Sequence, residues 1–338
     1  MRILHLYGGG GSRENIIMRK IICITPIKQI EGAIEALQKY GEVIYDPYIS
    51  KIDLKNKIID NKIDTIFTNP NKQTFKIDEK LLKETKIKTI CTASTGTNHI
   101  AMNYCKINDI KVLSLTRDYD VIKTITSTAE MAFTLMLALI RNLPNAVQSA
   151  SEYDWDYEKH IGRQLDHFIV GIVGYGRLGE HYARFCCPFF EDVWVTDPYK
   201  NVVDGYRQVE FDELLQGADV VALHVHLNKE TYHMIDEEAI SKMKDGAYLV
   251  NTSRGDIVDE YAVIKAIRGG KLKGYATDVI SDELDGDIYS SHLIKAMNEG
   301  LNIIISPHIA GMTKEAQEIA YLNSIYKLKK EIINGELV

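Results

Sequence analysis

A chain of 338 residues with 45% hydrophobic and 26% charged residues has the composition of a folded globular protein and is long enough for two domains. A formal net charge of -7 argues against a dedicated nucleic-acid-binding protein, because binding to phosphates needs a basic surplus. The most apolar segment, residues 131–140, is about half as long as a membrane-spanning helix. The N-terminal residues lack the apolar stretch of a signal peptide. We therefore expect a cytoplasmic protein that binds neither nucleic acid nor membranes.

The cysteines indicate the same compartment. They form no CxxC pair and no His/Cys spacing suited to zinc, and the last two are adjacent, which is poor geometry for a disulfide; they are Cys23, Cys91, Cys105, Cys186 and Cys187. This pattern favours a reducing environment and predicts no metal site.

The first third of the chain alternates short β-type runs with segments of helical spacing. The expected strands are residues 20–24, 42–45, 65–68, 88–92 and 111–115. Residues 29–40 and 98–107 between them have helical spacing. Strands separated by helices predict right-handed βαβ units and a parallel sheet.

The middle of the chain repeats this rhythm after a long helical stretch at residues 126–141. Its expected strands are residues 168–173, 192–196, 219–224, 246–250, 274–277 and 302–305. The segment 313–333 is helical again and is followed by no strand, so we expect it to pack on the first domain. The fold class is therefore α/β, with two doubly wound parallel-sheet domains.

A glycine-rich segment follows the expected strand that ends at Val173. Gly174, Gly176 and Gly179 fit the pattern GxGxxG, and a helical stretch follows them. Glycines let the backbone approach a pyrophosphate, and a helix N-terminus offers amide groups and a positive dipole end. Asp197, at the end of the next strand, can accept hydrogen bonds from ribose hydroxyls and would repel a 2′-phosphate, which favours NAD over NADP. A tight turn without a ligand fits these three features together less well. The other glycine run, residues 8–11, lacks the GK[ST] ending of a phosphate loop and is expected to be a flexible turn.

Three further expected strand ends carry residues suited to catalysis. Arg254 follows one strand, Asp278 ends the next with Glu283 five residues later, and His308 follows the last. Each residue alone could be an ordinary surface charge or loop histidine. Together at one sheet edge they fit a reaction: an arginine can grip a carboxylate, and a histidine with a carboxylate partner can exchange a proton near neutral pH.

With these residues, the chain resembles the D-isomer-specific 2-hydroxyacid dehydrogenase family over nearly its whole length. The matching motifs occur in the family's order, at residues 170–179, 250–259, 278–283 and 306–311. Four ordered motifs are far more specific than one. The resemblance implies a flavodoxin-like substrate-binding domain of residues 1–119 plus 313–338, and a Rossmann NAD-binding domain of residues 120–312.

The resemblance also implies a role for each matched residue. His308 would be the acid/base, Glu283 its partner, and Arg254 the clamp on the substrate carboxylate and carbonyl. Backbone amides near Thr95 and Gly96 would also bind the substrate carboxylate. Besides the three glycines, the implied cofactor contacts are Arg177 and Leu178 under the pyrophosphate, Asp197 on the ribose, Thr231 and Thr252 along the cofactor, Asp278 at the nicotinamide carboxamide, and Ala310.

The implied reaction is hydride transfer between NAD and a small 2-keto or D-2-hydroxy acid, in a homodimer to which the helix after residue 126 contributes. Two comparisons with members of this family narrow the range of expected substrates. Residues 68–73 contain no arginine of the phosphoglycerate type, and only Lys72 could substitute for it, so 3-phosphoglycerate is not the default substrate. Glu283 stands where formate dehydrogenases have Gln, so formate is disfavoured.

Two alternatives use the same motifs. One is an NADH-responsive binding protein of the co-repressor type, which the acidic balance weakens. The other is a dehydrogenase on the same plan whose substrate is not a hydroxy acid.

Overall fold

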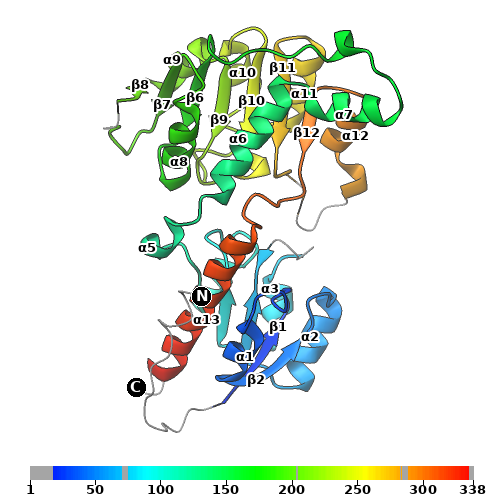
Figure 1. Ribbon diagram of the computed structural model, residues 1–338. Coiled ribbons are helices and arrows are strands. Elements are labelled where there is room, and N and C mark those ends of the chain that lie inside the picture. Colours follow the sequence, from blue (N-terminus) through cyan, green and yellow to red (C-terminus); the bar gives the residue numbers. More distant parts are fainter. Residues whose placement is uncertain (1–17, 71–74, 203–204, 282, 284–287, 335–338) are drawn as a thin grey trace. The chain divides into compact units, whose positions relative to one another are not determined.

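The computed structural model describes residues 18–70, 75–202, 205–281, 283 and 288–334 (Figure 1). The glycine run 8–11 and Lys72 lie outside the described residues. The chain divides into two compact units, residues 1–122 with 317–338, and residues 123–316. The domain boundaries expected from the sequence, after residues 119 and 312, fall three and four residues earlier than these.

The first unit is built on a five-stranded parallel sheet in the order β2-β1-β3-β4-β5. The strands are β1 (Arg19–Cys23), β2 (Gly41–Tyr45), β3 (Thr65–Thr68), β4 (Thr89–Thr92) and β5 (Lys111–Leu113). This order is that of flavodoxin-like doubly wound sheets. All five expected strands are present, and their ends differ from the expected ones by at most two residues.

Side chains alternate between the two faces along each strand, and both faces carry apolar side chains. Helices therefore cover both faces of this sheet. One face packs on α1 (Ala33–Gln38) and α13 (Lys314–Asn334), the other on α2 (Lys51–Asp60), α3 (Glu79–Leu82) and α4 (Met102–Ile107). Helix α13 presents a buried stripe at positions 321, 325, 328 and 332, the spacing of one helical face. The C-terminal helix thus returns to the first domain, as expected. Helix α5 (Tyr119–Ile122) ends the first passage of the chain through this unit.

The second unit contains a seven-stranded parallel sheet in the order β12-β11-β10-β9-β6-β7-β8. Its strands are β6 (Ile169–Val173), β7 (Asp192–Thr196), β8 (Arg207–Gln208), β9 (Val220–Leu223), β10 (Ala247–Asn251), β11 (Leu272–Thr277) and β12 (Ile303–Ile305). Counted from β6, the order 3-2-1-4-5-6 is that of a Rossmann fold, with one more strand at the β12 edge. Only β8 was not expected from the sequence.

Two helical layers sandwich this sheet (Figure 1). One layer is α6 (Ser127–Ile140) and α8 (Arg177–Cys186); the other is α9 (Phe211–Gly217), α10 (Glu237–Lys242), α11 (Glu260–Arg268) and α12 (His292–Asn298). The remaining helical segments are α7 (Leu143–Ser151) and three 3-10 turns, η3 (Tyr157–His160), η4 (Gly255–Ile257) and η5 (Ile288–Ser290). Among the described residues, no helix combines the length and apolar character needed to cross a bilayer.

The topology decides where functional side chains gather. Because all seven strands are parallel, the segments after β6, β10, β11 and β12 emerge at the same edge of the sheet. These segments carry the GxGxxG motif, Arg254, Asp278 and His308, respectively. Ligands of open parallel sheets bind at this edge.

Candidate active site

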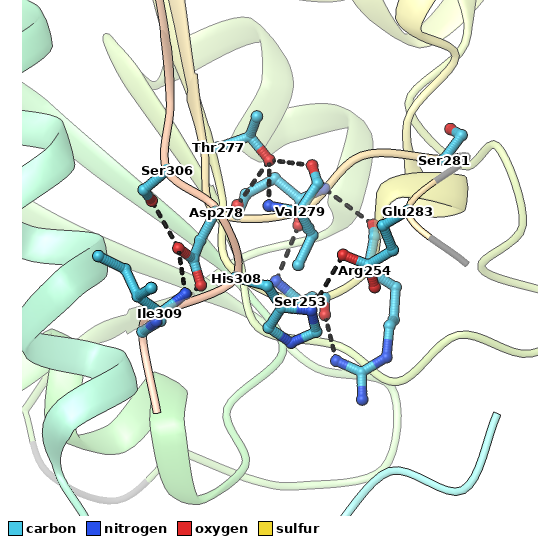
Figure 2. Close-up of polar contacts among 12 residues, drawn as sticks. Ser253, Arg254, Thr277, Asp278, Val279, Ser281, Glu283, Ser306, His308 and Ile309 are labelled. Atoms are coloured by element: carbon cyan, nitrogen blue, oxygen red, sulfur yellow. Dashed lines mark hydrogen bonds and ion pairs between the residues drawn. The ribbon is translucent and has the colours of Figure 1, made fainter. Parts of the chain in front are cut away.

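His308 and Glu283 form an ion pair at the carboxyl edge of the second sheet (Figure 2). The Nδ1 atom of His308 lies 2.9 Å from Oε2 of Glu283. The two side chains are 26% and 20% exposed, so the contact is shielded from solvent without being sealed off from it. A carboxylate on Nδ1 fixes the ring orientation and leaves Nε2 on the opposite edge as the atom for proton exchange.

Arg254 belongs to the loop after β10 and lies beside this pair (Figure 2). Burial lowers the pKa of Arg254, and the negative charge of Glu283 acts in the opposite sense. Two hydrogen bonds support the conformation of this loop: the Asn251 side chain donates to the Arg254 carbonyl at 2.9 Å, and Nη1 of Arg254 donates to the Ser253 carbonyl at 2.6 Å. The guanidinium can therefore present its remaining N–H groups to an anion without a large entropic cost.

Gly255 allows the loops after β10 and β11 to pack together. A Cβ at this position would lie 2.1 Å from the carbonyl carbon of Ile280 and 2.3 Å from the Ser281 nitrogen. No side chain fits in that space. Because Glu283 follows Ser281 closely, this contact keeps the loop of Glu283 against the loop of Arg254.

Asp278 anchors the loop that carries His308. Its carboxylate accepts hydrogen bonds from Ser306 Oγ at 2.5 Å and from the backbone amides of Ile309 at 2.9 Å and Ala310 at 2.8 Å. Burial raises the pKa of Asp278, and these three hydrogen bonds act in the opposite sense. The Asp278 side chain thus supports the loop of His308, a structural role that the sequence did not predict.

The backbone of His308 has a left-handed conformation, with φ of +52°. Residues other than glycine rarely adopt it, and it is typically maintained at functional sites by surrounding contacts. Here the His308 amide lies 2.9 Å from the carbonyl oxygens of both Asp278 and Ser306. The loop therefore holds the imidazole in one direction at the cost of some backbone strain.

The GxGxxG loop has the geometry of a dinucleotide cradle. Gly174 has φ of +93° and its Cβ position would lie 2.7 Å from the His224 carbonyl oxygen, and a Cβ on Gly179 would lie 2.0 Å from the Gly174 oxygen. Both glycines are thus required by the turn itself. Gly176 differs, because nothing lies within 4 Å of its Cβ position. Gly176 precedes α8, which has no side-chain cap, so open space and uncapped amides coincide where a diphosphate would bind.

Asp197 borders this loop at the end of β7. One carboxylate oxygen accepts from the Tyr175 amide at 2.8 Å, and the other accepts from the amides of Tyr199 at 2.9 Å and Lys200 at 3.1 Å. These bonds fix the carboxylate beside the glycine loop, and each oxygen retains acceptor capacity for a ribose hydroxyl.

The other expected cofactor residues differ in their surroundings. Thr252 is 7% exposed, and its buried hydroxyl has no hydrogen-bond partner among the described residues, so a ligand group could satisfy it. Thr231 donates to the His226 carbonyl at 2.6 Å and so closes its own turn. Leu178, on α8, is partly buried against the hydrophobic core, and Arg177 donates to the carbonyl of Ile125.

The loop that the resemblance implies for binding of the substrate carboxylate belongs to the first unit. The Ser94 hydroxyl donates to the Gly96 carbonyl at 2.7 Å, and the Thr116 hydroxyl donates to the Thr95 carbonyl at 2.6 Å. Within the part of the chain that the structure describes, neither the Thr95 nor the Gly96 amide donates to a protein group. The loop is therefore fixed through its carbonyls while two neighbouring amides remain available to an anion.

His224 is a residue of this edge that the sequence did not single out. It follows β9 directly, its ring packs on Tyr182 at 4.7 Å between centroids, and neither ring nitrogen has a hydrogen-bond partner among the described residues. Burial lowers the pKa of His224 to about 3, so the ring is neutral at physiological pH. Its position at the reversal of strand order, between β6 and β9, was the available signal.

Comparisons with known proteins agree with this geometry. The model of the D-isomer specific 2-hydroxyacid dehydrogenase family, NAD binding domain, matches residues 133–310. The chain is 35% identical over 243 residues to the D-specific alpha-keto acid dehydrogenase of Enterococcus faecium, covering 70% of this chain and 73% of the relative. It is 33% identical to the D-3-phosphoglycerate dehydrogenase of Archaeoglobus fulgidus over 93% of this chain, but spans 57% of that relative's length. The solved D-lactate dehydrogenase of Aquifex aeolicus, complexed with NAD and lactic acid, has a TM-score of 0.74 and 29% identity, covering 94% of this chain and 96% of that one.

The chain therefore belongs to the D-isomer specific 2-hydroxyacid dehydrogenase family. It is an NAD-dependent oxidoreductase of 2-keto and D-2-hydroxy acids. The family, cofactor and enzyme class predicted from the sequence are confirmed, and a protein that only senses NADH is not favoured.

Proposed function

We propose that the chain reduces a small 2-keto acid to the D-2-hydroxy acid, with His308 as the acid/base and Arg254 as the carboxylate and carbonyl clamp. The observation that carries this proposal is the convergence of His308, Glu283 and Arg254 at the carboxyl edge of the NAD-binding domain. Bound NADH supplies the hydride in this reaction.

The protein residues move the proton and stabilise charge. With Nδ1 held by Glu283, the protonated His308 donates from Nε2 to the keto oxygen as negative charge develops there. The guanidinium of Arg254 stabilises the same oxygen and the neighbouring carboxylate. In the oxidation direction, neutral His308 accepts the hydroxyl proton, and Glu283 stabilises the resulting imidazolium.

The substrate we propose is an unphosphorylated keto acid. The first unit offers the amides of Thr95 and Gly96 to a carboxylate. Residues 68–73, at the end of β3 and directly after it, include no arginine that could bind a phosphate. We assign substrate binding to this unit and NAD binding to residues 123–316, with Asp197 selecting NAD by its charge.

We also propose a homodimer in the cytoplasm. Large apolar side chains gather on the segment around α7, where Tyr153 is 97% and Trp155 is 87% exposed. Such a patch on a protein of this size is typical of an interface. All five cysteines are unpaired, which fits a reducing compartment. Light scattering after size exclusion of wild type and Trp155→Ser would test the dimer, and a monomeric wild type would refute it.

The catalytic proposal is tested by a panel of 2-keto acids scored by loss of NADH absorbance, with chiral analysis of each product. We expect activity with unphosphorylated keto acids and a D product. Arg254→Lys should lose at least about a hundredfold in kcat/KM, because lysine cannot grip a carboxylate with two parallel hydrogen bonds. The matched control is Arg268→Lys, an exposed arginine on α11 paired with Glu299, which should leave activity unchanged. An L product, or an unaffected Arg254→Lys enzyme, would contradict the proposal.

A further inference from the structure

Residues 123–126, here called the connector, form the non-helical segment between α5 and α6. The first unit ends at Ile122 and the second begins at Lys123, so the chain passes between the units at this point. The other passage, between Ala316 and Gln317, lies inside helix α13. Because Ala316 and Gln317 are helical, their backbone dihedral angles are more restricted than those of the connector, so the connector is the passage better able to act as a hinge.

Two side chains of α8 hold the connector by its backbone. Nη1 of Arg177 donates to the Ile125 carbonyl, and Nε2 of His181 lies 3.1 Å from the Lys123 carbonyl. A carbonyl only accepts, so Nε2 of His181 must be the donor. Positions 177 and 181 are four residues apart and thus share one face of the helix. One face of α8 therefore donates hydrogen bonds to two carbonyls of the connector, those of Lys123 and Ile125.

Arg177 is also the first residue of the helix that closes the GxGxxG loop. Its neighbour Gly176 faces the open space in which a diphosphate would bind. A guanidinium carries five N–H groups in a fixed fork, and the bond to Ile125 uses one nitrogen. The same side chain can therefore contact a phosphate while it holds the connector.

We propose that Arg177 and His181 are positioning residues that couple dinucleotide binding at the glycine loop to the conformation of the connector. This inference rests on the proposed placement of NAD at that loop. A bound diphosphate adds charge-assisted hydrogen bonds to Arg177, which fix the guanidinium and, through it, the Ile125 carbonyl. By thermodynamic reciprocity, a connector held by Arg177 and His181 raises the affinity for the cofactor. In this proposal Arg177 contacts both the diphosphate and the connector, whereas His181 contacts only the connector.

Hydrogen–deuterium exchange of the full-length protein, with and without NADH, tests the coupling directly. We expect NADH to slow exchange of the connector amides about tenfold in the wild type. Arg177→Lys keeps the positive charge at the phosphate but loses the fork, so it should still bind NADH while connector protection disappears. His181→Leu should weaken the protection, and His181→Gln, which still has a donor, should restore it.

A kinetic measurement separates positioning from simple destabilisation. We expect His181→Leu to lower kcat several-fold and, by reciprocity, to raise the Kd for NADH by about threefold at most, because the variant weakens the coupling and leaves the glycine loop intact. The control is His167→Leu, which removes an 83% exposed histidine of the same unit and should change neither value. Rescue of kcat by His181→Gln would support the coupling.

Failure of the coupling and failure of the proposed cofactor site would give different results. If wild type binds NADH and Gly176→Ala does not, but connector exchange is the same with and without NADH, the coupling is refuted and the cofactor site stands. Connector protection that survives in Arg177→Lys would likewise refute the role of Arg177. If Gly176→Ala binds NADH as tightly as wild type, the proposed cofactor site fails, and this inference fails with it.

Discussion

The imidazole of His308 and the carboxylate of Glu283 meet at 2.9 Å although 25 residues separate them in the chain. Each is carried by a different loop at the sheet edge, one after β12 and one after β11. Asp278 fixes the first loop, and the close approach at Gly255 fixes the second. The contact between these two proposed catalytic residues therefore depends on two anchored loops, and we expect changes to His308 and to Glu283 to have separable effects.

Removing the imidazole should abolish proton transfer without removing the cofactor site. We expect His308→Ala to lower kcat for keto-acid reduction by about two to four orders of magnitude, the usual contribution of a positioned acid/base. The Kd for NADH, measured by fluorescence titration, should change by less than about threefold, because the glycine loop is untouched. Near-normal turnover in this variant would remove His308 from the mechanism.

Neutralising the partner should have a smaller effect. Glu283→Gln keeps an oxygen that can orient the ring but removes the charge that stabilises the imidazolium. A hydrogen bond between charged groups contributes about 1.5–3 kcal/mol, so kcat should fall roughly tenfold to a hundredfold. Glu283→Ala, which also loses the orientation, should be slower still. Equal activity of wild type and Glu283→Gln would show that the ion pair has no part in the reaction.

Most of the fold could be predicted from the sequence because the strands have a clear hydrophobic pattern. Apolar runs such as Val220–Leu223 are buried on both faces and alternate with helical segments, which is the pattern of a parallel sheet. The strand β8 escaped prediction because Arg207 and Gln208 are exposed at the sheet edge and carry no apolar pattern. Its pairing with β7 depends on a neighbour and not on local propensity.

The proposed catalytic residues could be predicted from the sequence, but the residues that hold their loops in place could not. His308, Arg254 and Glu283 could be found because strand ends of a parallel sheet share one edge. The structural role of Asp278 could not, since its partners lie 28 to 32 residues away on another loop. The bond between Arg177 and Ile125 spans 52 residues and leaves no local signal. His224 was overlooked because its position is marked only by the strand order of the folded sheet, in which β9 lies beside β6.

The buried His224 should make the protein sensitive to acid. Its pKa is about 3 in the folded state, below the ordinary value of 6.5, so below pH 6.5 the unfolded chain binds a proton that the folded chain excludes. Stability from this residue is complete above pH 6.5 and is lost as the pH falls from there toward 3. Between pH 7 and 5 the loss is about 2 kcal/mol.

His224→Phe removes the titration and keeps a ring of similar shape against Tyr182. In urea unfolding at pH 7 and pH 5, we expect the wild type to lose about 2 kcal/mol more than the variant. His167→Phe, at an exposed position, is the control and should behave as wild type. If wild type and His224→Phe lose the same free energy on acidification, the buried neutral ring is not the cause of the acid sensitivity.

Two glycines of the same edge should respond in opposite ways to one added methyl group. Gly176→Ala places its Cβ in open space and has φ of -74°, so folding should be unaffected. The methyl group would occupy the approach of the diphosphate, so NADH affinity should fall at least about tenfold. Gly255→Ala instead forces the methyl group to 2.1 Å from the backbone of Ile280. The two loops must separate, which should cost about 1–3 kcal/mol of stability and misplace Arg254 against Glu283.

Thermal unfolding and NADH titration of both variants provide the comparison. We expect Gly176→Ala to keep the wild-type Tm and lose cofactor binding, and Gly255→Ala to show a lower Tm and a much lower kcat with residual NADH binding. An alanine at 176 that leaves the Kd for NADH unchanged would mean that no diphosphate approaches this glycine. An alanine at 255 with wild-type Tm and kcat would mean that the close packing of the two loops is not needed to align the catalytic residues.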